Sequence, residues 1–508
     1  MTSGSRPCHP WTPATSSWDD YWRSLTDVDK PLDECGVFGV VAPGQDVASI
    51  AYFGLYSLQH RGQESAGISV SDGQRLSTVK DVGLVAQVFD NPAVFAGLGG
   101  DGVLALGHTR YSTTGSNKFE NAQPLIAFHS SIGPIAVAHN GNLTNYSQLR
   151  QELLAKGVDF ETTSDTEVIV KLLEETPGDD LQTVLRESLP RLEGAYALVL
   201  MTTTTLVGAR DRLGVRPLSL GRLDTGGYVI ASETCAIDTV RAQFVQDVAP
   251  GEVVCIDGSG DPTFFRAQES PREAVCMLEF IYFARPDSSM MGRNLYESRL
   301  RMGRELARQD RLSNPEFEAD VVIDVPESAT PAAHGYAEES GIPYRQGLVK
   351  SRYITRTFIQ PSQTLRSAGV RLKFNPVRPI LEGSRVVVVD DSVIRGTTTG
   401  QLVSLLRSAG AAEVHIRVAS PPVHHPCFFG IDIGSREELL AVDRSEEELA
   451  EILEADSIRY LQKDGLARAV GHTIDHFCMA CFDGNYPVDI PADIGKLALE
   501  PQRTAPNV

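Results

Sequence analysis

Residues 385–400, RVVVVDDSVIRGTTTG, constrain the fold of this chain more than any other stretch. Four consecutive valines are typical of a strand that is buried on both faces of a parallel sheet. The loop that follows leads into TTGQLVSLLRSAG, where apolar residues recur at helical spacing up to Gly410. The next apolar run, EVHIRVAS, indicates another strand. This order predicts a βαβ unit inside a doubly wound α/β domain.

The loop after the valines has the chemistry of a phosphate site. A helix N-terminus offers unpaired N–H groups and a positive dipole end, so the loop can hold a phosphate monoester. Asp390 and Asp391 would repel phosphate, and they therefore suit a ligand that also brings hydroxyl groups or a divalent cation. A sugar phosphate with vicinal hydroxyls would satisfy both the helix N-terminus, through its phosphate, and the two aspartates, through its hydroxyls. The simpler interpretation is a strand-to-helix turn capped by Asp and Thr.

The rest of the chain predicts a second architecture. At 508 residues the chain is too long for one compact core. The runs GAYALVLM, TLVGARD, RPLSLG and GYVIASE follow one another with turns between them, which predicts an antiparallel meander, and SDTEVIVKLLE predicts a capped helix at 164–174. We therefore expect a leader at 1–34, an α+β domain at 35–260, an α/β domain at 270–488 and a loose tail at 489–508.

Composition excludes several classes of function. The 46 basic and 66 acidic side chains give a net charge of -20, which disfavours nucleic acid and anionic membranes as partners. We find no apolar run of about 18 residues, and the leader lacks the apolar segment of a secretory signal. We therefore expect a cytoplasmic protein. Its eight cysteines are too sparse for a disulfide scaffold, which favours catalytic or metal-binding roles for some of them.

The phosphate loop resembles the phosphoribosyl diphosphate (PRPP) motif of type I phosphoribosyltransferases. VIDVPESATPAA resembles the diphosphate loop of one subfamily, with Ser328 as a Mg²⁺ contact, although Asp more often stands in place of Glu327. KSRYITRTFIQPSQ resembles the mobile lid of that subfamily, and a solvated basic loop is its plainer interpretation. The resemblance implies Mg²⁺ and ribose contacts at Asp390 and Asp391. The other implied PRPP contacts are Ser392, Arg395, Gly396, Thr397 and Thr398, with Lys350, Arg352 and Arg356 in the lid.

Cys35 begins the stretch CGVFGV and could be a small core residue at the head of a strand. However, LQHRGQESAGI, GHTRYST, AHNGNL and SSDTEV resemble the class II glutamine amidotransferases, which are N-terminal-nucleophile hydrolases with antiparallel sheets sandwiched between helices. The resemblance implies that Cys35 is the nucleophile. Asn140 and the N–H of Gly141 would form the oxyanion hole, Arg110 and Asp165 would bind the carboxylate and ammonium groups of glutamine, and Arg61 and Tyr111 would lie on loops that close over it.

The resemblance also gives residues 1–34 a role. In this class the α-amino group of the cysteine is the general base, and a free amine has a pKa of about 8. While residues 1–34 are attached, the nitrogen of Cys35 is a peptide N–H and cannot accept a proton. We therefore predict that residues 1–34 are a propeptide, removed by cleavage after Glu34, and that the full chain lacks glutaminase activity. Cleavage would also remove all three tryptophans, Trp11, Trp18 and Trp22.

Four further cysteines stand at positions where one branch of the subfamily holds a 4Fe-4S cluster. They are Cys276, Cys427, Cys478 and Cys481. A C-x-x-C pair alone is weak evidence for a 4Fe-4S cluster, because zinc sites and redox sites contain the same pair. Zinc, with His424, His425, His472 or His476 as substitute ligands, therefore stays open as an alternative. Cys8, Cys235 and Cys255 match no ligand position and stay unassigned.

Together, the two domains resemble the glutamine phosphoribosyldiphosphate amidotransferases from residue 35 to about 487. This implies that ammonia released at Cys35 passes internally to PRPP, giving 5-phosphoribosylamine for purine synthesis. It also implies a homotetramer inhibited by purine nucleotides. Two alternatives remain: another class II amidotransferase, such as a hexosamine or asparagine synthesiser, and a PRPP-sensing regulator that binds DNA.

Overall fold

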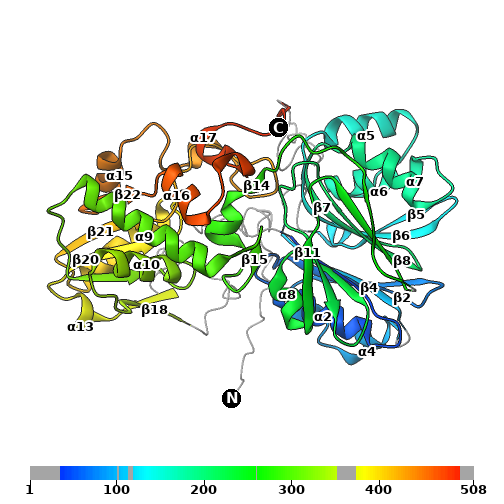
Figure 1. The fold of residues 1–508 in the computed structure, drawn as a ribbon, viewed down its shortest axis with the longest axis horizontal. Coiled ribbons are helices and arrows are strands. Elements are labelled where there is room, and N and C mark those ends of the chain that lie inside the picture. The colour runs from blue at the N-terminus through cyan, green and yellow to red at the C-terminus, as the bar shows by residue number, and fades with distance from the viewer. Residues whose placement is uncertain (1–34, 100–101, 112–117, 259, 352–372, 492–508) are drawn as a thin grey trace, which may run out of the picture.

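The computed structural model describes residues 35–99, 102–111, 118–258, 260–351 and 373–491. The predicted propeptide, most of the predicted lid and nearly all of the tail lie outside these residues. The described chain forms two lobes side by side, the first built on antiparallel sheets and the second on a parallel sheet (Figure 1). The predicted fold class is confirmed. No helix of the described residues is long and apolar enough to cross a membrane.

The first domain contains a seven-stranded sheet of order β11-β9-β10-β1-β4-β2-β3 and a six-stranded sheet of order β13-β12-β8-β7-β6-β5. Neighbouring strands in both sheets are antiparallel. The strands are β1 (Gly36–Val41), β2 (Ser65–Ser71), β3 (Leu76–Val82), β4 (Leu104–Arg110), β5 (Leu125–His129), β6 (Gly133–Leu143), β7 (Gly194–Met201), β8 (Thr205–Arg210), β9 (Ser219–Leu223), β10 (Tyr228–Ala231), β11 (Ala242–Asp247), β12 (Glu252–Asp257) and β13 (Thr263–Arg266).

Helices cover the outer face of each sheet, so the domain has four layers (Figure 1). Aliphatic side chains such as Val37, Leu106 and Val199 fill the space between the two sheets. A second cluster joins one sheet to α2 and α8, and a third joins the other sheet to α5, α6 and α7. The helices are α2 (Val47–Ser57), α3 (Val85–Val88), α4 (Pro92–Ala96), α5 (Tyr146–Ala155), α6 (Asp165–Glu175), α7 (Leu181–Ser188) and α8 (Thr234–Thr239), with 3-10 turns η1 (Phe119–Asn121) and η2 (Leu189–Arg191).

The predicted four-stranded meander is wrong in its connectivity. Strands β7 and β8 pair with each other, as do β9 and β10, but the two pairs belong to different sheets. The chain crosses between the sheets after Asp211, whose carboxylate accepts hydrogen bonds from the N–H groups of Leu213 and Tyr196. In addition, β13 extends the first domain past the predicted limit at 260, because it pairs with β12.

The second domain has a four-stranded parallel sheet of order β17-β20-β21-β22. The predicted βαβ unit is confirmed as β20, α14 and β21. The strands of the domain are β14 (Val275–Cys276), β15 (Ser289–Met290), β16 (Arg293–Asn294), β17 (Val321–Asp324), β18 (Leu348–Lys350), β19 (Phe374–Pro376), β20 (Arg385–Asp390), β21 (Glu413–Val418), β22 (Ser457–Tyr460) and β23 (Phe477–Cys478). Its helices are α9 (Leu295–Ser313), α10 (Thr330–Ser340), α13 (Arg378–Leu381), α14 (Thr397–Ser408), α15 (Glu446–Ile452), α16 (Lys463–Val470) and α17 (Ala480–Asp483), with the π-helix η3 (Glu279–Phe283) and 3-10 turns η4 (Arg436–Glu438) and η5 (Ile474–His476).

The two domains share one buried apolar cluster. It contains Leu213 and Val215 from the first domain together with Met277 and Phe280 from the second. Strand β14 lies between the lobes, where it pairs in parallel with β23 (Figure 1). The junction is therefore a continuation of the core.

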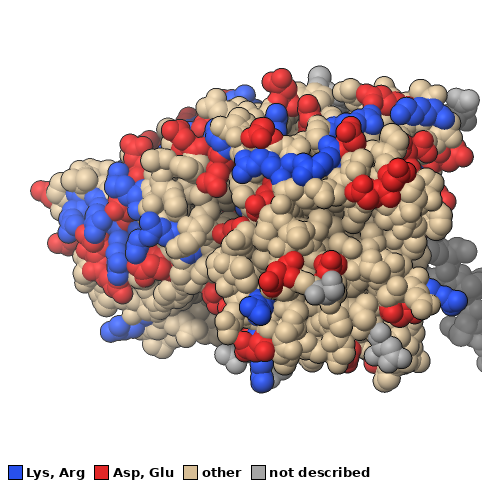
Figure 2. Space-filling view, turned by 45° about the vertical axis from the view of Figure 1, so that its right-hand side comes forward, with Lys and Arg blue, Asp and Glu red and all other residues tan. Residues whose placement is uncertain are grey.

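Charged side chains of both signs stand next to one another on the face seen in Figure 2. Exposed ion pairs also join α9 to α10, with Arg304 on Glu338 and Arg308 on Glu339. Exposed pairs of this kind contribute about 0 to 1 kcal/mol each, so they are not what holds α9 against α10.

The backbones of α9 and α10 approach each other closely at two glycines. A Cβ added to Gly303 of α9 would lie 1.8 Å from the carbonyl oxygen of Ala332, and one added to Gly335 of α10 would lie 1.8 Å from that of Leu300. Each glycine therefore accepts the backbone of the opposite helix where no methyl group could fit.

We predict that Gly303→Ala destabilises the second domain by about 1 to 3 kcal/mol, because the new methyl group forces the helices apart. Alanine is the better helix former, so helix propensity alone predicts the opposite sign. A matched control is Gly400→Ala in α14, where the nearest atom is 3.8 Å away, on Leu453. Thermal unfolding followed by circular dichroism should show a lower midpoint for Gly303→Ala and an unchanged or higher one for Gly400→Ala. Equal midpoints for the two variants would contradict this account.

Candidate active sites and cysteine cavity

Cys35 lies at the head of β1, a central strand of the seven-stranded sheet. Its side chain is buried, and its Sγ donates a hydrogen bond to the carbonyl oxygen of Tyr111 at 3.4 Å. Burial raises the pKa of the Cys35 thiol to about 11, although the Tyr111 carbonyl and the Arg110 cation act against this rise. The thiol of the full-length chain is therefore protonated at neutral pH and needs a base before it can attack an amide.

The predicted glutamine contacts gather near this thiol. Arg110 ends β4, and Asp165 begins α6 after the N-cap Ser164, whose side chain accepts a hydrogen bond from Thr166 N. Both charged groups are buried and act electrostatically on the pKa of Cys35. One carboxylate oxygen of Asp165 accepts a hydrogen bond from the N–H of Leu143 at 3.0 Å. The structure thus brings together a thiol, a cation and a carboxylate.

The predicted oxyanion donors lie on β6. The Nδ2 of Asn140 is buried and has no hydrogen-bond partner among the described residues, so it is a donor available to a ligand. Gly141 has a φ of 142°, and a Cβ there would lie 2.1 Å from the carbonyl oxygen of Ala195. Only glycine therefore fits this position.

Two buried histidines connect the strands that carry these groups. His108 Nε2 lies 3.1 Å from the carbonyl oxygen of His139, which joins β4 of one sheet to β6 of the other. Burial lowers the pKa of His108 to about 3 and also lowers that of His139. Both rings are therefore neutral, and the ring N–H of His108 can donate to that carbonyl. This bond ties β4, which carries Arg110, to β6 of the facing sheet, which carries Asn140.

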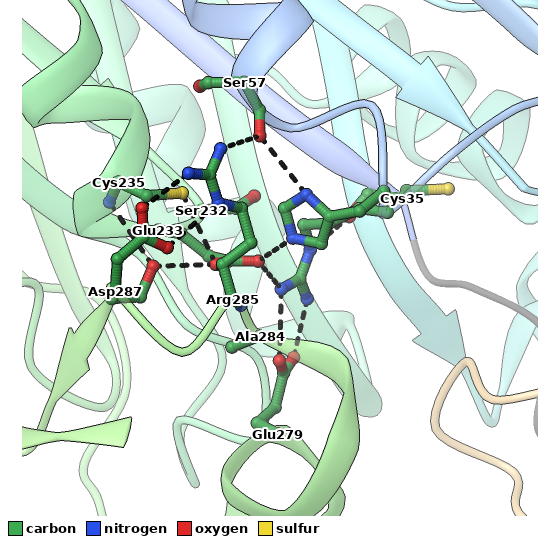
Figure 3. Close-up of polar contacts among 12 residues, drawn as sticks. Cys35, Ser57, Ser232, Glu233, Cys235, Glu279, Ala284, Arg285 and Asp287 are labelled. Carbon is green, nitrogen blue, oxygen red and sulfur yellow. Dashed lines mark hydrogen bonds and ion pairs between the residues drawn. The ribbon is translucent and has the colours of Figure 1, made fainter. Parts of the chain in front are cut away.

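Arg61 and Tyr111 were predicted to close over glutamine. The Tyr111 hydroxyl instead donates to Asp432 of the second domain at 3.3 Å. Arg61 is buried, and its guanidinium donates to the Cys35 carbonyl oxygen and to the carboxylates of Glu233 and Glu279 (Figure 3). In this structure both side chains bridge the two domains, and a role in closing over glutamine stays a prediction.

The sequence interpretation missed the carboxylates that hold Arg61. Glu279 interrupts the apolar run CMLEFIYF and is fully buried. An acidic residue inside such a run is a signal for a buried ion pair. Its partner could not be identified from sequence, because Arg61 lies 218 positions earlier.

The loop at residues 427–432 of the second domain packs against the predicted glutaminase site. In addition to Asp432, it contributes the carbonyl oxygen of Phe428, which accepts a hydrogen bond from Asn142 at 3.0 Å. Gly430 lies against Gly141, since a Cβ on Gly430 would be 3.1 Å from the Gly141 carbonyl carbon. We call residues 427–432 the junction loop.

The predicted PRPP residues lie at the carboxyl edge of the parallel sheet, where loops following adjacent strands β17 and β20 meet. Asp390 ends β20, and its carboxylate accepts a hydrogen bond from the N–H of Asp391. Ser392 donates to Asp391 at 2.8 Å. Gly396 has a left-handed conformation, and α14 starts at Thr397, so the N-terminus of the helix faces this loop as predicted.

Two of the cations predicted to bind PRPP lie near carboxylates of the protein in this structure. Arg395 pairs with Glu438 at 2.9 Å. Lys350, at the end of β18, lies 3.8 Å from Glu327, which precedes Ser328. The start of the predicted lid therefore adjoins the predicted diphosphate loop. Arg352 and Arg356 lie outside the described residues.

Four cysteines that are distant in sequence line one cavity. They are Cys276, Cys427, Cys478 and Cys481, and the other lining residues include Val215, Phe429, Ile431 and Tyr486. Cys276 and Cys478 are direct neighbours in the β14–β23 pair. Burial raises the pKa of Cys276 to about 11 and raises those of Cys478 and Cys481 further, with the neighbouring thiols adding to the effect. A cation at this site would offset that cost by stabilising the thiolates.

Four thiols are chemically suitable donors for either a zinc ion or a 4Fe-4S cluster. No three His, Cys, Asp or Glu side chains within the described ranges are positioned to hold one metal ion, although all four thiols face the cavity. Zinc needs four donors within about 2.3 Å of one point, whereas a 4Fe-4S cluster separates its four thiolates. His472 faces the Met291 carbonyl and His476 faces Glu273. The unassigned Cys235 and Cys255 do not line the cavity, and Cys8 lies outside the described residues.

We predict that Cys35 of the full-length chain reacts slowly with iodoacetamide. A pKa of about 11 instead of 9.0 leaves about a hundredfold less thiolate at pH 8, and only the thiolate is alkylated. The rate constant should rise about tenfold per pH unit between pH 8 and pH 10. Timed labelling followed by peptide mass spectrometry measures this rate against N-acetylcysteine. A Cys35 that reacts as fast as the free thiol would contradict the described burial.

The two domains match two known domain families. The profile of the glutamine amidotransferase domain matches residues 108–239, and that of the phosphoribosyl transferase domain matches residues 293–420. The second match argues against a hexosamine or asparagine synthesiser, because those enzymes carry different second domains.

Relatives match over nearly the whole chain. The amidophosphoribosyltransferase of Synechococcus elongatus is 48% identical over 93% of this chain and 95% of its own length. The amidophosphoribosyltransferase of Bacillus subtilis is 46% identical over 92% of this chain and 97% of its own length. A solved glutamine PRPP amidotransferase from B. subtilis, complexed with ADP and GMP, has a TM-score of 0.84 and 44% identity, with coverage of 91% and 99%. A second solved structure, an allosteric regulatory enzyme of purine biosynthesis, has a TM-score of 0.86 and 44% identity, with coverage of 93% and 100%. The chain therefore belongs to the amidophosphoribosyltransferase family, which consists of pentosyltransferases with a glutamine amidotransferase domain.

Proposed function

We propose that the chain converts PRPP, glutamine and water into 5-phosphoribosylamine, glutamate and pyrophosphate, the first committed step of purine synthesis, with Cys35 as the glutaminase nucleophile. One observation supports this proposal most strongly. A buried thiol beside Arg110 and Asp165 occurs in the same chain as the DDSVIRGTTT loop, and the two domains share a core.

Glutamine hydrolysis begins once the peptide bond before Cys35 is cut. The freed α-amino group takes the thiol proton, directly or through one water, and the thiolate attacks the amide carbon. Asn140 Nδ2 and the N–H of Gly141 stabilise the developing oxyanion. Arg110 pairs with the glutamine carboxylate, and Asp165 with its ammonium group. The amine then returns the proton to the departing ammonia, and water releases glutamate from the thioester.

Phosphoribosyl transfer takes place at the carboxyl edge of β20. Asp390 and Asp391 hold the ribose hydroxyls, and the loop from Arg395 to Thr398 with the α14 N-terminus holds the 5-phosphate. Mg²⁺, held by these aspartates and Ser328, would neutralise charge on the diphosphate. Lys350, Arg352 and Arg356 stabilise the pyrophosphate as it leaves C1. Ammonia then bonds to C1 in its place.

Ammonia has to reach the second site unprotonated, since ammonium is not nucleophilic. The junction loop supports an internal route, because it contacts Gly141, Asn142 and Tyr111 on the glutaminase side. We propose that closure of the lid at about 350–372 completes this route.

We further propose that the four cavity cysteines hold a 4Fe-4S cluster, which would fix Cys427 and thereby the junction loop. The chemistry of the donors supports this proposal, since four thiols from three separate segments face one cavity. The homotetramer implied by the resemblance is likewise a proposal. Feedback inhibition by purine nucleotides is supported by the B. subtilis relative that was solved with ADP and GMP.

We predict that Cys35→Ala abolishes glutamine-dependent pyrophosphate release, by at least about a thousandfold, because no other group can form the thioester. Pyrophosphate release with ammonium chloride at pH 8.5 should stay within about threefold of wild type, since the PRPP site is unchanged. A matched control is Cys255→Ala, which removes a partly buried thiol on β12 and should preserve both activities. Glutamine-dependent activity in the Cys35→Ala enzyme would overturn the assignment.

Protein purified without oxygen should contain about four iron atoms per chain and be brown. Cys478→Ala should lose most of this iron and colour, because a cluster with three thiolates is held less tightly. Cys235→Ala removes a buried thiol outside the cavity and should retain the iron. Metal analysis and the visible spectrum give the result. Stoichiometric zinc, or colourless protein without iron, would refute the cluster.

A further inference from the structure

The carbonyl oxygen of the nucleophile is held by a group that depends on the other domain. Arg61 Nε donates to Cys35 O at 3.1 Å. Its two terminal nitrogens donate to Glu279 at 2.6 and 3.1 Å, so the guanidinium forms a two-pronged pair with a carboxylate of the second domain (Figure 3). A planar guanidinium fixed at both prongs has one orientation for its Nε–H, and here it points at Cys35.

Burial makes the orientation of Arg61 depend on Glu279. Arg61 is 2% exposed and Glu279 is 0% exposed, so neither can exchange its partner for water. Glu233 also accepts from Arg61 at 2.6 Å, but its carboxylate is shared with His60 and Ser288. Loss of the Glu279 charge therefore weakens the two hydrogen bonds that fix the guanidinium fork of Arg61.

Glu279 itself sits on a well-anchored element. It begins the π-helix η3, and Arg299 of α9 donates to the carbonyl oxygens of Phe280 and Ala284 at 2.9 and 2.6 Å. Arg216 approaches Glu279 at 3.6 Å and donates to the Phe429 carbonyl of the junction loop. π-Helices are rare, and they occur frequently at functional sites.

We propose that Glu279 is a positioning residue for glutamine hydrolysis, acting across the domain junction through Arg61 on the backbone of Cys35. This inference rests on the proposed function. Cleavage turns Cys35 into a chain end, and unanchored chain ends lose order. The carbonyl is then a fixed point from which the α-amino base and the thiol project, so its orientation determines whether both reach the substrate amide.

The first test is Glu279→Gln, which keeps the shape of the side chain and removes the charge. Glutaminase kcat should fall about 10- to 100-fold, as expected when reacting groups are displaced by about 1 Å. The KM for glutamine should change less than about threefold, because Arg110 and Asp165, which are predicted to bind the charged groups of glutamine, are positioned by β4 and by the start of α6. Ammonia-dependent pyrophosphate release should also stay within about threefold of wild type.

A matched control separates positioning from loss of a buried ion pair. Asp310→Asn breaks the buried pair with Arg417 at 2.5 Å, within the second domain and away from Cys35. It should lower the unfolding midpoint and leave the ratio of glutamine- to ammonia-dependent activity unchanged. If Glu279→Gln also leaves this ratio unchanged, the proposal is wrong.

Arg61→Lys tests the same contact from the first domain and remains informative if Glu279→Gln does not fold. Lysine cannot bond the carboxylate fork and the Cys35 carbonyl together, so the same fall in kcat is expected. The double variant should be no worse than the poorer single variant within about twofold, because both changes break one contact. Additive losses would overturn the proposal. Absence of glutaminase in the processed wild-type enzyme would instead refute the proposed function.

Discussion

Strand β1 is hydrogen-bonded along both edges, to β4 on one side and to β10 on the other, and Cys35 lies immediately before it. The register pairs Gly36 with Thr109, so Cys35 lies beside Arg110 and Tyr111. A nucleophile attached to a central strand cannot drift, because moving it would break two ladders of hydrogen bonds. Arg110, Asn140 and Asp165 can act on a substrate only if they keep their positions relative to Cys35.

This placement creates a chemical requirement. The burial that raises the pKa of the thiol to about 11 excludes water, which strengthens hydrogen bonds to an oxyanion but also suppresses the thiolate. An amine at the same residue is a base that needs no space beyond that of the nucleophile. We therefore propose the free α-amino group of Cys35 as the base, in keeping with the tight packing around the thiol.

The second domain does more than bind its own substrate. Its junction loop contacts Gly141, Asn142 and Tyr111, and its Glu279 holds Arg61. Cys427 begins that loop, and its sulfur accepts a hydrogen bond from the N–H of Phe429. The cysteine cavity, the junction loop and the glutaminase site thus form one continuous packed region. Residues of both domains therefore surround the predicted glutaminase site.

The sequence predicted what local patterns can encode. The valine run before Asp390, the loop at Gly396 and the helix after it appear as β20 and α14, and the capped helix appears as α6 with Ser164 as its N-cap. Sequence could not predict that β8 and β9 belong to different sheets. An alternating pattern of apolar residues identifies the buried face of a strand, but it does not identify the sheet that the strand joins. It also could not pair Arg61 with Glu279, since a contact between distant positions leaves no periodic signal.

The identity of the first residue in active enzyme decides whether the α-amino group of Cys35 is the base. Intact mass and N-terminal sequencing should be performed on the same preparation whose glutaminase activity is measured. We predict that activity appears only in chains that begin at Cys35, which have lost 34 residues and all tryptophan emission. Full glutaminase activity in protein that begins at Met1 and retains tryptophan fluorescence would contradict it.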